Sequence, residues 1–427
     1  MKKLTIIALL LLLYACNSES DKKTITNPSD YNKYLKNDSL PTKVAVDEEM
    51  VFWQERVDKN DQDFVAMSKL ADLNTALFGV TGDVSKLYVS ENLTKKVHDI
   101  SVRNRDTYLR SLAHNYISQH RFKEAQVLLD SAYTYSDNKR ATELMLFDVA
   151  MELGDYTAAD TYLGKVQKPN DYNYLIRLSK WSDYRGDLDS AIKYMEQAKK
   201  IAEAGGIKSL KVWTYSNLAD YYGHAGRIKD SYDHYLKTLQ LEPDNSYAKK
   251  GIVWIVYSSE KNTEEANRIL DSIMQHHKVP DYFLLKAEMA EYDGNLSEAK
   301  AQKENFLKAV QFGNYGNMYN TYVIELLSET DPQKALAMAE QEVENRATPE
   351  TYHILAYAQL RSGNKAEALK TIMMHVEGKT HEPMAAYHSA VIYKANGLSS
   401  KLEEAKGELL EASYELGPVL TNEIKEW

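Results

Sequence analysis

The strongest constraint on the fold of this chain is an internal repeat that recurs from about residue 106 to near the C-terminus. Each copy contains a Gly-Asp turn or a variant of it, followed about five residues later by a small residue. When these turns are aligned, copies begin near residues 106, 140, 172, 212, 247, 280, 316, 349 and 384. The copies are 32 to 40 residues apart. A repeat of about 34 residues predicts a stack of similar helical units, each burying its apolar face against its neighbours.

The composition favours helices as the repeating element. The 427 residues include only 18 glycines and 9 prolines, about half of average usage. So few turn-forming residues argue against sandwiches, barrels and β-helices. We therefore expect long helices joined by short connections.

The clearest copy spans residues 212–245. Its first half places Leu218, Ala219 and Tyr222 on one face of a helix, and Gly226 then provides a turn before the second half. This pattern resembles the tetratricopeptide repeat (TPR) family. The resemblance implies an all-α fold, a right-handed α-solenoid of about nine helix–turn–helix repeats after a degenerate N-terminal helical pair.

The same alignment predicts the domain boundaries. Residues 49–99 form a degenerate N-terminal cap or repeat, residues 100–415 form the solenoid, and residues 416–427 form a C-terminal capping helix. One interval is 40 residues long, and we attribute the extra length to Ala204, Gly205 and Gly206.

The N-terminus carries a targeting pattern. Lys2 and Lys3 precede a short apolar stretch that ends in Leu13-Tyr14-Ala15-Cys16, and Cys16 is the only cysteine. This resembles the lipobox of bacterial lipoproteins, which implies a signal peptide over residues 1–15 and acylation of Cys16 with diacylglycerol and a fatty acid such as palmitate. The polar residues 16–48 are expected to be a flexible tether. In some lipoproteins an aspartate after the cysteine retains the protein at the inner membrane. Asn17 stands at that position here, so the resemblance implies the outer membrane. It does not indicate which face of that membrane the protein occupies.

The sequence contains little that indicates catalysis. It has no phosphate-binding loop, no GxSxG and no HExxH motif. A single cysteine excludes a cysteine metal cluster, and the spacing of His381, Glu382 and His388 is wrong for a metal site. We therefore expect no enzyme activity, no cofactor and no metal. The net charge of −10, without a basic stripe, disfavours nucleic acid.

The TPR resemblance also indicates where a ligand would bind. In that family, defined positions of the first helix of each repeat line the concave groove. Carried onto this chain, they are Arg110, His114, Lys180, Tyr184, Trp213, Asp220, His224, Glu288, Tyr292, His353, Tyr357 and Arg361.

These observations lead to a prediction of function. We expect a membrane-anchored scaffold or adaptor of the bacterial cell envelope that binds a partner protein or peptide in its groove. The alternative is a surface glycan-binding lipoprotein of a nutrient-uptake system. The sequence does not indicate the oligomeric state.

Overall fold

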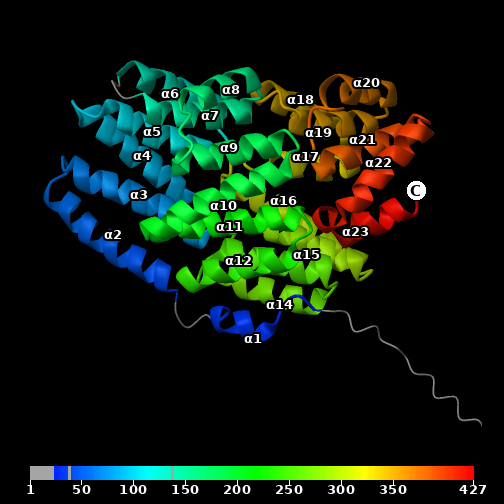
Figure 1. Ribbon diagram of the computed structural model, residues 1–427, viewed down its shortest axis with the longest axis horizontal. Coiled ribbons are helices and arrows are strands. Elements are labelled where there is room, and N and C mark those ends of the chain that lie inside the picture. The colour runs from blue at the N-terminus through cyan, green and yellow to red at the C-terminus, as the bar shows by residue number, and fades with distance from the viewer. Residues whose placement is uncertain (1–23, 37–39, 136–138) are drawn as a thin grey trace, which may run out of the picture.

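The computed structural model describes residues 24–36, 40–135 and 139–427, and throughout these ranges the secondary structure is helical (Figure 1). The predicted signal peptide and Cys16 lie outside the described residues. Within the described ranges, no helix is both long and apolar enough to cross a lipid bilayer.

The repeats are antiparallel helical pairs, and each predicted repeat start lies within about four residues of a helix start. The prediction of an all-α solenoid is therefore confirmed. In the described part of the chain the nine pairs are α5 (Arg105–Ser118) with α6 (Phe122–Tyr135), α7 (Arg140–Leu153) with α8 (Tyr156–Lys165), α9 (Tyr172–Tyr184) with α10 (Leu188–Gly205), α11 (Lys208–His224) with α12 (Ile228–Leu241), α13 (Ser246–Trp254) with α14 (Thr263–Met274), α15 (Asp281–Tyr292) with α16 (Leu296–Gly313), α17 (Asn320–Thr330) with α18 (Pro332–Asn345), α19 (Pro349–Arg361) with α20 (Lys365–His375), and α21 (Pro383–Ala395) with α22 (Ser399–Glu411).

Small residues and turn glycines explain why the pairs form. Ala125, Ala191 and Ala368 are completely buried between helices, where a larger side chain would hold the two axes apart. Gly206 ends the long helix α10 with a φ of 70°, which accounts for the 40-residue interval. Local chemistry thus sets both the pairing and the spacing.

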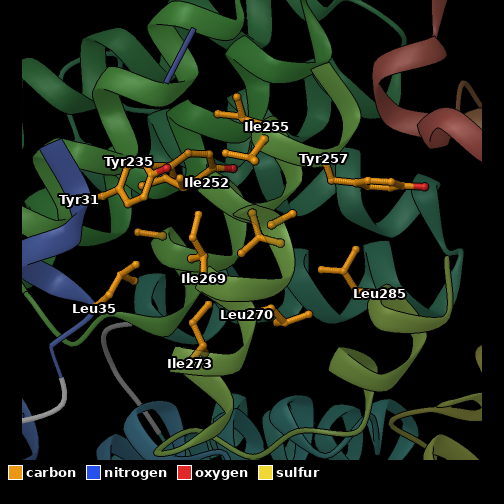
Figure 2. Close-up of a cluster of buried hydrophobic side chains, with 14 of the residues drawn as sticks. Tyr31, Leu35, Tyr235, Ile252, Ile255, Tyr257, Ile269, Leu270, Ile273 and Leu285 are labelled. Carbon is orange, nitrogen blue, oxygen red and sulfur yellow. The ribbon is translucent and has the colours of Figure 1, made fainter. Parts of the chain in front are cut away.

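One repeat departs from regular geometry. Helix α13 continues into η2, a π-helical turn over Ile255–Ser259. The wider turn carries Ile255, Val256, Tyr257 and Ser258, all of which are buried. Tyr257 and Ile255 lie in the large apolar cluster shown in Figure 2.

Among the described residues, the three longest helices that precede the repeats are α2 (Pro41–Lys59), α3 (Phe64–Thr81) and α4 (Ser85–Ile100). Helices α3 and α4 form the degenerate pair predicted within residues 49–99. Helix α2 packs against α3. Since α2 begins at Pro41, the prediction of a flexible tether is wrong for residues 41–48.

The tether prediction is also wrong for residues 24–36, which we call the N-terminal strap. The strap contains α1 (Pro28–Tyr31) and η1 (Asn32–Tyr34) and lies against α12, η2 and α14. Tyr31 is only 1% exposed and Leu35 is also buried (Figure 2). These apolar side chains stand in a polar segment, and the apolar surface that receives them lies about 200 residues away in sequence.

The solenoid winds tightly enough for successive superhelical turns to touch. The backbone N–H of Lys278 donates to the carbonyl of Thr81 at 2.9 Å, and Lys123 donates to the carbonyl of Glu344 at 2.6 Å. The second pair of residues is 221 positions apart. Helix ends of the first half of the chain therefore contact the second half, and Figure 1 shows α7 and α8 beside α18.

The C-terminal helix differs from its prediction. Helix α23 spans Ser413–Lys425 and is interrupted at Gly417, whose φ and ψ are 76° and 171°. Beyond the break, Ile424 packs with Leu409 against the last repeat. Before the break, however, the segment turns inward and contacts α11, η2 and α15.

Candidate functional site

The contact between superhelical turns encloses a cavity of about 420 Å³, which we call the inter-turn cavity. One wall comes from α7, α9 and the adjoining turns. The other comes from the connections before α19 and α21, together with α23. Its lining residues include Glu152, Tyr156, Lys180, Asp183, Tyr184, His224, Arg346, Glu350, His381, Glu382 and Glu415.

Two charged groups of residues hold the walls together. Glu152 forms ion pairs with Lys180 at 2.9 Å and with Arg346 at 3.6 Å, joining α9 to the α18–α19 connection. His224 Nδ1 lies 2.6 Å from a carboxylate oxygen of Glu415. Burial lowers the pKa of His224, but the Glu415 carboxylate more than offsets this effect and the pKa is raised.

Three other carboxylates in the cavity lack a lysine or arginine partner in the part of the chain that the structure describes. Among the described residues, Asp183, Glu350 and Glu382 form no ion pair with lysine or arginine, although Glu350 accepts a hydrogen bond from Thr380. Partial burial and then the neighbouring carboxylates raise the pKa of Glu382. Burial also raises the pKa of Asp183. Five carboxylates therefore line the cavity against two basic side chains, Lys180 and Arg346.

An aromatic wall borders these carboxylates. The rings of Tyr156 and Tyr184 stack with centroids 4.1 Å apart, and Trp181 lies 5.3 Å from Tyr184. A second cavity of about 560 Å³ shares Tyr156, Tyr184 and His381 with the first, and Arg185 and Lys379 line it. Aromatic faces next to carboxylates are suited to a cationic side chain.

The structure brings together only some of the predicted groove residues. Lys180, Tyr184 and His224 line the inter-turn cavity, and Asp220 and His224 line a smaller cavity of about 250 Å³ beside it. Arg110, His114 and Trp213 lie elsewhere on the first half of the solenoid. Arg110 is paired with Asp106, whereas Trp213 is exposed and meets the edge of Tyr172.

The remaining predicted groove residues contact the chain itself. Glu288 accepts a hydrogen bond from Tyr257, whose ring meets that of Tyr292. Tyr357 and Arg361 both bond to Glu329. His353 is buried, with its Nδ1 atom 2.9 Å from that of His388.

The C-terminal segment crosses the middle of the predicted groove. The Tyr414 carbonyl accepts hydrogen bonds from Trp254 Nε1 at 3.1 Å and from Ser258 at 2.7 Å. A side chain at Gly417 would collide with Glu288. The groove is therefore not one continuous surface, because part of it is covered by this chain.

Asp220 illustrates a predicted groove residue with a structural role. Its two oxygens accept hydrogen bonds from the phenols of Tyr235 at 2.5 Å and Tyr247 at 2.6 Å. We expect Asp220→Ala to lower the free energy of unfolding by about 2 kcal/mol, because it leaves the buried Tyr235 phenol without its acceptor. Denaturant titration measures this, and Tyr247→Phe, which alters an exposed phenol, should cost less. An unchanged midpoint for Asp220→Ala would contradict the structural role.

Several residues of the site were missed at the sequence level. Glu152 and Tyr156 flank the turn within one repeat, and Arg346 and Glu350 lie at the boundary between two repeats. In the sequence, His381 and Glu382 resemble only part of a metal-binding motif, and their spacing to His388 is wrong for one. Among the described residues no group of three or more histidine, cysteine or carboxylate side chains is arranged to hold a metal ion.

Comparison with models of protein families finds no match, and comparison with curated proteins finds none either. Solved structures do show similarity. A tetratricopeptide repeat protein from Parabacteroides merdae has 12% identity and a TM-score of 0.39, covering 57% of this chain and 92% of its own. PilW, a type IV pilus biogenesis factor, has 13% identity and a TM-score of 0.39, covering 51% and 98%. Yeast Tom70 has 14% identity and a TM-score of 0.34, covering 93% and 94%. Similarity at this level leaves the function to be argued from the residues of this chain.

Proposed function

We propose that this protein is a membrane-anchored adaptor of the bacterial cell envelope, attached through a lipid on Cys16, that binds a segment of a partner protein in the inter-turn cavity. The observation that carries the binding site is the group of Asp183, Glu350 and Glu382 around one cavity. Their charge is not neutralised by lysine or arginine among the described residues. A partner that supplies lysine or arginine would relieve this repulsion.

The geometry favours an extended segment with basic side chains. The inter-turn cavity continues past Tyr184 into the second cavity and past His224 into the smaller one. A ligand can therefore extend along the contact between turns while one cationic side chain enters between the carboxylates and the Tyr156–Tyr184 stack. Because the walls are joined by the Glu152 ion pairs, the site is largely formed before the ligand arrives.

An oligosaccharide is the second candidate ligand. Aromatic rings beside carboxylates also suit a sugar, whose apolar face stacks on a ring while its hydroxyl groups donate to acids. The Tyr156, Trp181 and Tyr184 cluster is the observation that favours this alternative.

Binding of matched peptides tests the proposal. Ten-residue extended peptides with alternating lysine or arginine are titrated against residues 17–427, beside the same peptides with glutamine in place of each basic residue and a panel of neutral oligosaccharides. We expect only the basic peptides to bind. The triple variant Asp183→Asn, Glu350→Gln, Glu382→Gln should weaken their binding at least tenfold, about 1.4 kcal/mol.

A second triple variant controls for net charge. Glu264→Gln, Glu304→Gln and Glu340→Gln remove three exposed carboxylates outside the cavity. This variant should change the peptide affinity less than twofold. Equal weakening by both triple variants would refute the cavity as the binding site, and binding of an oligosaccharide without any peptide would favour the alternative.

A further inference from the structure

The N-terminal strap is held in place by specific hydrogen bonds. The backbone N–H groups of Ile25 and Thr26 both donate to Oε1 of Glu260, at 2.8 and 2.7 Å. The phenol of Tyr31 donates to Glu265 at 2.6 Å. A carboxylate that receives two backbone donors fixes the direction of the chain where it reaches the solenoid.

Apolar packing holds the rest of the strap. Tyr31 and Leu35 enter the cluster formed by α12, η2 and α14, and Figure 2 shows both side chains directed toward Ile252 and Ile269. The carbonyl of Leu35 accepts a hydrogen bond from Ser272 at 2.8 Å. The strap is thus attached along its length and not only at one point.

We propose that the strap sets the orientation of the protein on the membrane, so that α12 and α14 face the lipid bilayer and the inter-turn cavity is directed away from it. This inference rests on the proposed lipid anchor at Cys16. The partner of the strap-bearing face is a lipid surface, and the strap determines which side of the solenoid meets that surface.

Chain length limits the gap to the bilayer. Thr24 follows Cys16 by eight residues, and eight residues span at most ~28 Å even when fully extended. A tether reaching residue 48, as the composition predicted, would span up to ~110 Å. Because the strap is docked, the bilayer lies within ~28 Å of the place where residue 24 meets the solenoid.

The position of the strap decides which face that is. Figure 1 shows α1 at the lower edge beside α14, with α7, α8, α18 and α20 at the opposite edge. The inter-turn cavity is lined from α7, α9 and the connections that follow α18 and α20. Anchoring through the strap therefore leaves the cavity accessible to a partner on the side away from the membrane.

Energy transfer to labelled lipids tests this orientation. The full chain is produced in a lipidating bacterium and reconstituted into phosphatidylcholine vesicles that contain an acceptor-labelled lipid. Lipidation consumes the thiol of Cys16, so an engineered cysteine is the only reactive thiol. A donor dye is placed at exposed Glu264→Cys on α14 or at exposed Val127→Cys on α6. We expect at least threefold more transfer from position 264 than from position 127.

Strap variants distinguish docking from anchoring. Tyr31→Ala should release the strap and bring the transfer ratio close to one, whereas the exposed Lys33→Ala should leave it unchanged. Glu260→Ala provides a second release variant if Tyr31→Ala does not fold. Equal transfer from both dyes on an otherwise unaltered protein that floats with the vesicles would overturn the orientation alone. If the unaltered chain does not float with vesicles, or if Cys16→Ser floats equally well, the lipid anchor is wrong, and the orientation with it.

Discussion

Replacing His353 and His388 together by glutamine is expected to make the free energy of unfolding about 4 kcal/mol less sensitive to acidification from pH 7 to pH 5. The two imidazoles are buried, with their Nδ1 atoms 2.9 Å apart. One Nδ1 atom must therefore carry the proton and the other accept it, so at least the accepting ring is neutral. Burial lowers the pKa of His353 to about 3, and burial together with His353 lowers the pKa of His388 well below its ordinary value.

The direction in which stability changes with pH follows from these lowered pKa values. In the unfolded chain each histidine takes up a proton near pH 6.5, whereas the folded protein resists protonation until a much lower pH. Stability is therefore complete above pH 6.5 and is lost as the pH falls, by about 2 kcal/mol for each histidine at pH 5. Glu325 lies 3.9 Å from His388, but its own pKa is raised to about 7 by burial, so it is mostly neutral at pH 5. It therefore supplies little counter-charge, and the neighbouring Tyr357 and Tyr387 supply none.

Denaturant titrations of both proteins at several pH values measure the effect. Other buried histidines, such as His234 and His277, also have pKa values lowered by burial. They remain in both proteins, so the difference between the two pH profiles isolates the pair. His114→Gln, at an exposed position, is the matched control and should leave the profile unchanged. Parallel profiles for the double variant and the unaltered protein would show that the folded pair takes up protons over the same pH range as the unfolded chain, and would contradict the prediction.

Gly154→Ala is expected to lower the free energy of unfolding by about 3 kcal/mol. Gly154 has a φ of 77°, which costs an alanine about 1–2 kcal/mol. A Cβ atom there would also lie 2.7 Å from the carbonyl oxygen of Ala347, in the next superhelical turn. Backbone cannot move aside as a side chain can, and overpacking of this kind adds about 1–3 kcal/mol.

Gly294→Ala is the matched control for this prediction. Gly294 has a nearly identical φ of 75° in the equivalent turn of another repeat, but a Cβ atom there would meet nothing within 4 Å. This variant should lose only about 1 kcal/mol, which corresponds to the backbone strain. The excess loss in Gly154→Ala measures the contact between turns. Equal losses in the two variants would mean that the superhelix is open in solution and that the inter-turn cavity does not form.

The candidate site was only partly predictable because it is built by contacts between turns. Lys180, Tyr184 and His224 stand at groove positions that each repeat defines locally, so the repeat register identified them. Glu152 at the end of α7 and Arg346 and Glu350 at the α18–α19 boundary belong to the same cavity, but the repeat register did not identify them. Glu152 and Arg346 are 194 residues apart and meet only because the solenoid completes a turn between them.

The docking of the N-terminal strap also depends on residues distant in sequence and was not predictable locally. Its charged and polar residues are typical of a linker, and composition gives no weight to three apolar side chains among them. Ile25, Tyr31 and Leu35 become ordered because α12 and α14 present an apolar surface at the place where the chain begins. That surface is assembled from residues more than 200 positions away.

The sequence by itself determined the helical class, the repeat length and, to within about four residues, where each repeat begins. These depend on interactions within one or two repeats: small residues between paired helices, glycine where φ is positive, and apolar residues at helical spacing. Only the tertiary structure decided how the repeats wind, where the strap docks and where the C-terminal segment turns inward. Small rotations between neighbouring repeats add up over the whole solenoid. No single repeat carries their sum, so the inter-turn cavity arises only in the complete fold.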